Sequence, residues 1–315
     1  MHVYVSFFIR PDLREPLMAD FPNATFTFAP HDVNEEALAT ANVLLTYGED
    51  VTEDLLEKAP QLQWIFVASA GIEKLPAQAI VERNIIVSNV RGIHKKPMAE
   101  SIIGHILALK RAIPWMYEQK KKGEWSQEVR QEELNGSTAL ILGPGAIGGE
   151  IGRILQKFDV TTIGCNRSGE RAKYMDETIT FEKLKDYLPN ADIVLSLLPK
   201  TKETDRLFSY DYFVSMKETA IFMNFGRSNI VEESVLIGAL KEGQIASVVL
   251  DVFDEEPLSK DSELWTLDGV VISPHISSRS SRYVERSLAI FKPSLRKFMQ
   301  GYRNLENIVD LKRGY

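Results

Sequence analysis

Three polar side chains that could act together on a carboxylate-bearing carbonyl compound occur in this 315-residue sequence. They are Arg227, Glu256 and His275, and they follow the apolar runs at 220–224, 247–252 and 270–273. A guanidinium holds a carboxylate through two parallel hydrogen bonds, and an imidazole can give a proton to a carbonyl oxygen. A carboxylate on the second ring nitrogen orients the imidazole and favours its charged form. Taken singly, each could be an ordinary loop residue. Their joint appearance after successive runs favours an active site.

A glycine cluster provides the second chemical signal. Gly143-Pro-Gly145-Ala-Ile-Gly148 fits the G-x-G-x-x-G pattern, which by itself is more often a simple turn. Here an apolar run at 138–142 precedes it and apolar residues at helical spacing follow it, which is typical of a dinucleotide-binding unit. Gly143 permits the tight turn, Gly145 lets the backbone approach a pyrophosphate, and Gly148 lets the helix pack on the sheet. The N-terminus of the helix then attracts the phosphates.

The stretch Asn166-Arg167-Ser168 lies roughly 20 residues beyond the last glycine, where the second strand of such a unit ends. An NAD-preferring site carries an acidic residue there, because its carboxylate accepts hydrogen bonds from the ribose 2′-hydroxyl. The acid is absent here. Arg167 could instead pair with a 2′-phosphate, and Asn166 and Ser168 could donate hydrogen bonds to it. The sequence therefore favours NADP(H), and NAD(H) stays possible if Arg167 is a solvated loop residue.

The residues around these motifs predict an α/β fold. Short β-branched runs alternate with amphipathic helical stretches, which is the pattern of a parallel sheet covered by helices. The runs expected to be strands lie at 3–8, 42–47, 63–68 and 84–88, and then at 138–142, 160–165, 192–198, 220–224, 247–252 and 270–273. The second series of six suits a Rossmann doubly wound parallel sheet, and the first suits a smaller flavodoxin-like α/β domain.

Two domains are expected, with the dinucleotide-binding domain inserted into the other. The stretch 100–111 is helical in pattern and would connect them. Residues Val284 to Phe298 place apolar side chains at helical spacing and would pack back on the first domain. The predicted substrate domain comprises residues 1–98 and 285–315, and the predicted dinucleotide-binding domain comprises residues 99–284.

Composition and charge argue against other classes of protein. A formal net charge of -7 gives no general attraction to nucleic acid, and no apolar run is long enough to span a membrane. The N-terminal residues meet charge too early for a signal peptide. Cys165 is the single cysteine, and no His/Asp/Glu grouping has convincing metal-ligand spacing. We expect a cytoplasmic protein that binds no nucleic acid, no membrane and no metal.

The chain resembles the D-isomer-specific 2-hydroxyacid dehydrogenases over nearly its whole length. The resemblance is carried by the glycine loop and by Ala68-Ser-Ala-Gly-Ile72, Asn89-Val-Arg-Gly-Ile93, Met98-Ala-Glu100, Asn224-Phe-Gly-Arg227, Asp251-Val-Phe-Asp-Glu-Glu-Pro257 and Ser273-Pro-His275. The ending from Asn307 to Tyr315 is similar to that of shorter members that include glyoxylate/hydroxypyruvate reductases. Pro144 departs from the usual glycine loop, and Ile72-Glu73 stands where many relatives carry Val-Asp. The second departure leaves the substrate open.

The resemblance implies hydride transfer between NAD(P)H and a small 2-oxo acid, which gives a D-2-hydroxy acid. Arg227 would hold the substrate carboxylate, and His275 would be the proton donor supported by Glu256. The backbone at Ala70 and Gly71 would also receive the carboxylate, since small residues allow close approach. Further cofactor contacts are expected at Ala146, Ile147, Leu198, Pro199, Thr204, Asn224, Gly226, Asp251 and Ser277. The helix near 101–119 and the region from Trp115 to Trp125 would form a homodimer surface.

Several functions stay open at this point. A substrate like glyoxylate or hydroxypyruvate is preferred, and a phosphoglycerate dehydrogenase-like activity or a bulkier 2-oxo acid is the alternative. A nucleotide-sensing protein without turnover is a third hypothesis, because fold alone does not establish catalysis. The presence of both Glu256 and His275 favours an enzyme, since a sensor needs neither.

Overall fold

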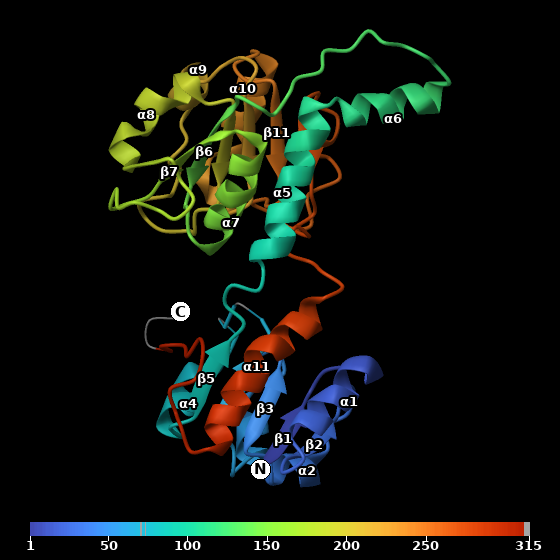
Figure 1. Cartoon of the computed structure of the whole chain (residues 1–315), viewed down its shortest axis with the longest axis vertical. Helices are drawn as coiled ribbons and strands as arrows, with labels where there is room; N and C mark the ends of the chain where they lie inside the picture. The colour runs from blue at the N-terminus through green and yellow to red at the C-terminus, as the bar shows by residue number, and fades with distance from the viewer. Residues whose placement is uncertain (70, 73, 312–315) are drawn as a thin grey trace. The chain divides into compact units, whose positions relative to one another are not determined.

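The computed structural model describes residues 1–69, 71, 72 and 74–311 of the chain. The predicted substrate residue Ala70 lies outside these described residues. The chain divides into two compact units, each with its own sheet and its own core (Figure 1). Unit 1 comprises Met1–Ile93 and Ser280–Tyr315, and unit 2 comprises His94–Arg279.

Unit 1 contains a parallel sheet that has five strands among the described residues. They are β1 (His2–Val5), β2 (Thr25–Phe28), β3 (Val43–Thr46), β4 (Trp64–Val67) and β5 (Ile86–Asn89). Their order, β2-β1-β3-β4-β5, is that of the flavodoxin-like doubly wound fold. Four of them coincide with predicted runs, whereas β2 was not predicted. It is an edge strand in which no residue is fully buried, so it lacks a continuous apolar run.

Helices cover this sheet, and the C-terminal helix forms much of its core. The helices are α1 (Pro11–Asp20), α2 (Glu35–Ala39), α3 (Glu53–Lys58), α4 (Ala77–Glu82) and α11 (Tyr283–Met299). The Phe291 ring of α11 stacks on Trp64 of β4, with ring centroids 5.3 Å apart, and Leu295 is buried in the same cluster. The prediction that this helix packs back on the first part of the chain is confirmed.

The segment after α11 closes the free edge of β5. Ile308 forms an antiparallel bridge with Ser88, and the Val309 N–H donates to Val87 O at 2.9 Å. Asn307 has a φ of 53°, and its Nδ2 donates to the carbonyl oxygens of Asn89 and Arg91, each at 3.1 Å. An edge strand that pairs in this way no longer exposes its N–H and C=O groups.

Unit 2 contains a parallel sheet that has seven strands among the described residues. They are β6 (Thr138–Leu142), β7 (Thr161–Cys165), β8 (Glu177–Ile179), β9 (Ile193–Ser196), β10 (Ile221–Asn224), β11 (Ser247–Leu250) and β12 (Val270–Ile272). Their order is β12-β11-β10-β9-β6-β7-β8, a Rossmann order with one further strand at the β12 edge. The six predicted strands are confirmed. The short edge strand β8 was not predicted.

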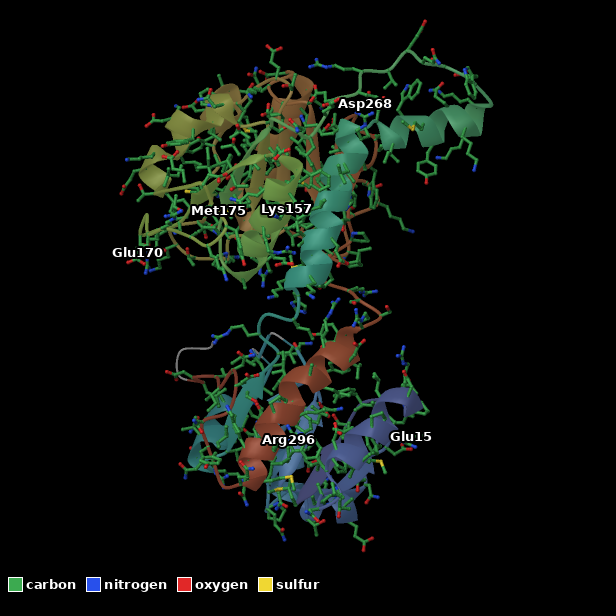
Figure 2. The ribbon with its side chains drawn as sticks, in the orientation of Figure 1. Glu15, Lys157, Glu170, Met175, Asp268 and Arg296 are labelled. Carbon is green, nitrogen blue, oxygen red and sulfur yellow. The ribbon has the colours of Figure 1, made fainter. Side chains whose placement is uncertain are left out.

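The helices of unit 2 lie on both faces of this sheet, except α6 (Ile113–Lys122), which extends away from it (Figure 1 and Figure 2). They are α5 (Lys95–Lys110), α6 (Ile113–Lys122), α7 (Ala146–Leu155), α8 (Leu184–Tyr187), α9 (Tyr210–Val214) and α10 (Glu233–Lys241). Successive strand residues point to opposite faces, so β6 gives Ala139 and Ile141 to one core cluster and Leu140 and Leu142 to the other. The two-domain α/β fold class predicted from the sequence is confirmed.

The expected helix near 101–119 is in fact two helices. Ala112 between α5 and α6 has a φ of 53°, a left-handed conformation that a continuing α-helix does not allow. None of the α6 residues is buried within the chain. Across the described part of the chain, no helix is both long and apolar enough to cross a bilayer.

Candidate active site

The glycine loop has the geometry needed to approach a phosphate group. Gly143 has a φ of +85°, and a Cβ at Gly148 would lie 2.8 Å from Gly143 O, so both positions require glycine. A Cβ at Gly145 would meet no atom within 4 Å and would project into open space. The helix α7 begins at the next residue, and the N–H groups of its first turn have no partner within the helix. This open cradle of N–H donors fits a pyrophosphate.

Loops from three neighbouring strands meet beside the glycine loop. A Cβ at Gly143 would lie 3.4 Å from the Leu198 side chain, and one at Gly226 would lie 2.4 Å from Leu198 O. The Thr204 hydroxyl donates to Pro199 O at 2.7 Å and so fixes the loop after β9. The structure thus brings these predicted cofactor residues together at the carboxyl ends of β6, β9 and β10.

The loop after β7 uses the Asn166 amide for its own shape. Asn166 Oδ1 accepts from Gly169 N–H at 2.7 Å, and Nδ2 donates to Glu170 O at 2.9 Å. The Ser168 hydroxyl donates to Asn166 Oδ1 at 3.3 Å. Arg167 is exposed. Among the three predicted contacts to a 2′-phosphate, the guanidinium is therefore the group left available by this arrangement.

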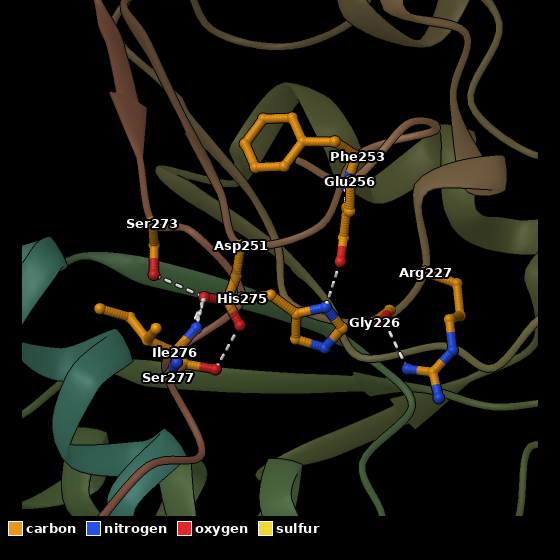
Figure 3. A network of polar contacts seen from close by, with 9 residues as sticks. All are labelled: Gly226, Arg227, Asp251, Phe253, Glu256, Ser273, His275, Ile276 and Ser277. Atoms are coloured by element: carbon orange, nitrogen blue, oxygen red, sulfur yellow. Dashed lines mark hydrogen bonds and ion pairs between the residues drawn. The ribbon is translucent and has the colours of Figure 1, made fainter. Parts of the chain in front are cut away.

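Glu256 and His275 form a pair at the ends of β11 and β12. His275 Nδ1 lies 2.7 Å from Glu256 Oε2, which leaves Nε2 as the nitrogen free to face a ligand (Figure 3). Oε1 of the same carboxylate accepts from Phe253 N–H at 3.1 Å. An apolar cavity of about 450 Å³ adjoins the pair, and its lining includes Trp265, Ile272 and Pro274.

The surroundings shift the pKa of the Glu256 carboxyl downward. Partial burial raises this pKa, but hydrogen bonds from His275 and from Phe253 N–H, with the nearby charges of His275 and Arg227, outweigh it. The carboxylate therefore stays ionised in the neutral range, where it can stabilise a protonated imidazole. Arg227 acts on the carboxyl through its positive charge, which favours the ionised form.

A buried carboxylate holds the loop that carries His275. Asp251, 2% exposed, accepts hydrogen bonds from the hydroxyls of Ser273 and Ser277 and from the N–H groups of Ile276 and Ser277. His275 itself has a φ of 53°, an uncommon conformation for a residue with a side chain. Both oxygens of Asp251 accept hydrogen bonds from this loop, so the carboxylate holds the loop in place (Figure 3).

Arg227 is positioned by the turn after β10. Its Nη1 donates to Gly226 O at 2.9 Å, and the buried Asn224 donates through Nδ2 to Arg227 O at 3.0 Å. The Asn224 Oδ1 accepts from Gly226 N–H at 3.2 Å, so one amide fixes both ends of the turn. Arg227 is exposed and belongs to unit 2 with the other predicted catalytic residues, whereas the predicted substrate residue Gly71 belongs to unit 1.

Sequence reasoning missed the part played by Ser273. Its hydroxyl bonds to Asp251, which directly follows the neighbouring strand β11. The Ser273-Pro-His275 motif contained the serine, but no spacing along the chain could indicate a partner that only the pairing of β11 with β12 brings near. Among the described residues, no group of His, Cys, Asp and Glu could hold a metal ion.

A parallel sheet with a phosphate cradle at its switch point and a histidine–carboxylate pair beyond its strands defines a dinucleotide-dependent enzyme class. Residues 103–277 match the family described as D-isomer specific 2-hydroxyacid dehydrogenase, NAD binding domain. The chain belongs to the D-isomer-specific 2-hydroxyacid dehydrogenases, a family of NAD(P)-binding oxidoreductases.

Individual relatives differ in the activity that their names state. The chain is 31% identical to glyoxylate/hydroxypyruvate reductase B of Shigella flexneri over 289 residues, 89% of each chain. It is also 31% identical to D-3-phosphoglycerate dehydrogenase of Methanocaldococcus jannaschii, and this match spans 88% of the chain but only 53% of that protein. The chain thus spans about half the length of that relative.

Solved structures share the fold over the full length of the chain. A D-isomer specific 2-hydroxyacid dehydrogenase family protein from Aeromonas salmonicida is 32% identical, with a TM-score of 0.83 and coverage of 98% of this chain and 99% of that one. An NADPH-dependent glyoxylate/hydroxypyruvate reductase from Sinorhizobium meliloti, solved with NADP and sulfate, is 25% identical. Its TM-score is 0.75, and the match covers 100% of this chain and 99% of that one.

Proposed function

We propose that this protein reduces small 2-oxo acids to D-2-hydroxy acids, with NADP(H) as the preferred cofactor and glyoxylate and hydroxypyruvate as typical substrates. The observation that carries the proposal is the 2.7 Å contact between Glu256 and His275 Nδ1 within electrostatic reach of Arg227. The named activity of the Shigella flexneri relative supports the choice of substrates.

The roles of the three residues follow from their chemistry. The reduced nicotinamide cofactor, when bound, supplies a hydride to the carbonyl carbon. His275 Nε2 gives its proton to the carbonyl oxygen and takes a proton back in the oxidation direction. Glu256 holds Nδ1 and stabilises the imidazolium, while Asp251 keeps the histidine loop in its unusual conformation.

The substrate carboxylate needs donors in a fixed arrangement. Arg227 has a planar fork that matches a carboxylate, and its position is fixed by the turn from Asn224 to Gly226. We assign the amides at Ala70 and Gly71 to the same carboxylate. The first part of the chain with the C-terminal segment, residues 1–98 and 285–315, then serves as the substrate domain, and residues 99–284 bind the dinucleotide.

The NADP(H) preference rests on the loop after β7. Arg167 is exposed, and no acidic residue stands at the end of that strand to repel a 2′-phosphate. The NADPH-dependent relative from Sinorhizobium meliloti supports this choice.

We propose that the surface formed by α6 and the residues that follow it is the interface of a homodimer. Large apolar side chains are exposed there, namely Ile113, Met116, Tyr117 and Trp125. Burying such side chains against a second copy would remove them from water.

The test is turnover by the purified protein with a panel of 2-oxo acids, each assayed with NADPH and with NADH. The proposal expects oxidation of NADPH that depends on the 2-oxo acid. Binding of NADPH without turnover of any acid would instead favour the nucleotide-sensing alternative.

A further inference from the structure

The carboxylate that contacts His275 is carried by an exposed loop. Glu256 lies between β11 and a short 3-10 helix, η5 (Glu263–Trp265), and residues 254–257 are all exposed. Glu256 Oε1 accepts from Phe253 N–H at 3.1 Å, which ties the side chain to the β11 end of the loop. An exposed loop with few buried side chains opens more easily than a core element. The other end of the loop therefore also needs an anchor if Glu256 is to stay on His275.

The helix η5 is anchored to the body of unit 2. Its middle residue, Leu264, is 1% exposed and belongs to a core cluster of the sheet. Leu264 N–H donates to the Ser262 hydroxyl at 3.3 Å, and Glu263 forms an ion pair with Lys241 of α10. This short helix therefore provides a fixed point for the exposed loop.

The Trp265 side chain joins η5 to this loop. Its Nε1 donates to the carbonyl oxygen of Ser259, which follows Glu256 closely in the chain, at 2.8 Å. Trp265 is 51% exposed, so water could satisfy the indole N–H, and burial does not impose the bond to the loop. The ring also lines the apolar cavity of about 450 Å³ that adjoins Glu256 and His275. The indole thus holds the loop beside the histidine–carboxylate pair.

We propose that Trp265 is a positioning residue for the reaction, because its indole ties the Glu256 loop to η5 and so keeps the carboxylate on His275 Nδ1. The inference rests on the proposed function, in which His275 gives up a proton and Glu256 stabilises the imidazolium. Trp265 needs no contact with substrate or cofactor in this role. Its effect on turnover should therefore pass through Glu256.

The variant Trp265→Phe removes the indole N–H and keeps an aromatic ring beside the cavity. The loop then loses one hydrogen bond, and we expect kcat/KM for glyoxylate to fall by about fivefold. NADPH affinity and thermal stability should stay at the wild-type level, because neither the glycine loop nor the core is altered. The matched control is Ser259→Ala, which keeps the backbone oxygen that accepts the bond and should change kcat/KM by less than about twofold.

A double-mutant cycle with Glu256→Ala shows whether Trp265 acts through the carboxylate. Glu256→Ala leaves no carboxylate to position, so adding Trp265→Phe to it should lower kcat/KM by less than about twofold further. If the two losses multiply instead, Trp265 acts independently of Glu256 and the inference is overturned. Wild-type kcat/KM in Trp265→Phe would overturn it as well.

The ring nitrogens of His275 report the contact with Glu256 without any substrate. The protein is labelled with ¹⁵N at its five histidines, and His275→Ala identifies the NMR resonances of His275. Trp265→Phe should move these resonances toward their positions in Glu256→Ala, whereas Ser259→Ala should leave them in place. Wild-type resonance positions in Trp265→Phe would overturn the inference.

Failure of this inference can be told from failure of the proposed function. If the wild type turns over no 2-oxo acid, the proposed function falls, and the His275 resonances still decide whether Trp265 holds Glu256 in place. If the wild type turns over glyoxylate and Trp265→Phe leaves both turnover and resonances unchanged, the proposed function stands and this inference falls.

Discussion

Replacing Glu256 with glutamine removes one charge from the His275 pair while keeping the size of the side chain. In the wild type, the carboxylate bonds to Nδ1 at 2.7 Å, and the charges of His275 and Arg227 help to keep it ionised. A hydrogen bond to a charged group is worth about 1.5–3 kcal/mol, and a neutral one about 1 kcal/mol. The side chains of His275 and Glu256 are 52% and 37% exposed, so screening brings the difference to about 1 kcal/mol.

A loss of about 1 kcal/mol in this contact corresponds to roughly a fivefold change in a rate or equilibrium constant. We therefore expect Glu256→Gln to lower kcat/KM for 2-oxo acid reduction by about fivefold at neutral pH. The difference between wild type and variant should hold across the neutral range and disappear only where acid protonates the Glu256 carboxyl, whose pKa lies below its usual value. The assay is the pH profile of kcat/KM for glyoxylate, measured with NADPH at saturation.

The neighbouring residue supplies the control for this experiment. Glu255 is exposed, and Glu255→Gln makes the same chemical change one position away. Glu255→Gln should leave the pH profile of kcat/KM unchanged. If Glu256→Gln keeps the wild-type profile, or if both variants shift it equally, the carboxylate does not act through His275 and the reasoning is refuted.

Three further predictions concern carboxylate binding, cofactor choice and the C-terminal segment. Arg227→Lys should lower kcat/KM for glyoxylate by about 10–100-fold, because the lysine ammonium group lacks the planar fork of a guanidinium. NADPH affinity, measured by fluorescence, should not change. An unaltered kcat/KM would show that Arg227 does not bind the substrate. Arg167→Ala should raise the KM for NADPH by about tenfold and leave that for NADH within twofold; equal effects on both would count against the 2′-phosphate contact. Asn307→Ala should lower the free energy of unfolding by about 2 kcal/mol. The variant loses two side-chain hydrogen bonds, and alanine is disfavoured at the φ of 53° found there. Asn307→Gly tolerates the positive φ, so it should lose only the stability that the two side-chain hydrogen bonds supply. If the Gly and Ala variants lose the same free energy of unfolding, the positive φ does not contribute.

Much of the fold could be predicted from the sequence because buried strands leave continuous apolar runs. β10 and β11 pair along their whole length, each has a neighbour on both sides in the unit 2 sheet, and both coincide with predicted runs. The edge strands β2 and β8 were missed for the opposite reason, since each is short and only partly buried. The break in the helix near 101–119 was missed as well, although Pro114 in the first turn of α6 is a helix-start signal.

The sequence predicted which residues belong to the candidate site, but it did not predict the hydrogen bonds between them. Residue types at strand ends brought Arg227, Glu256 and His275 together, since the carboxyl ends of parallel strands meet at one edge. The bonds of Asp251 to the histidine loop depend on the pairing of β11 with β12, which lies beyond local sequence. The same holds for Asn166, whose amide was expected to face a phosphate but bonds to Gly169 and Glu170.

The central claim is that His275 supplies the proton for reduction of a 2-oxo acid. The most direct measurement compares wild type with His275→Ala in glyoxylate-dependent oxidation of NADPH, with NADPH affinity measured on both. We expect rapid oxidation by the wild type and loss of turnover by at least a hundredfold in the variant, with NADPH binding unchanged. Turnover by His275→Ala within a few fold of the wild-type rate would contradict it.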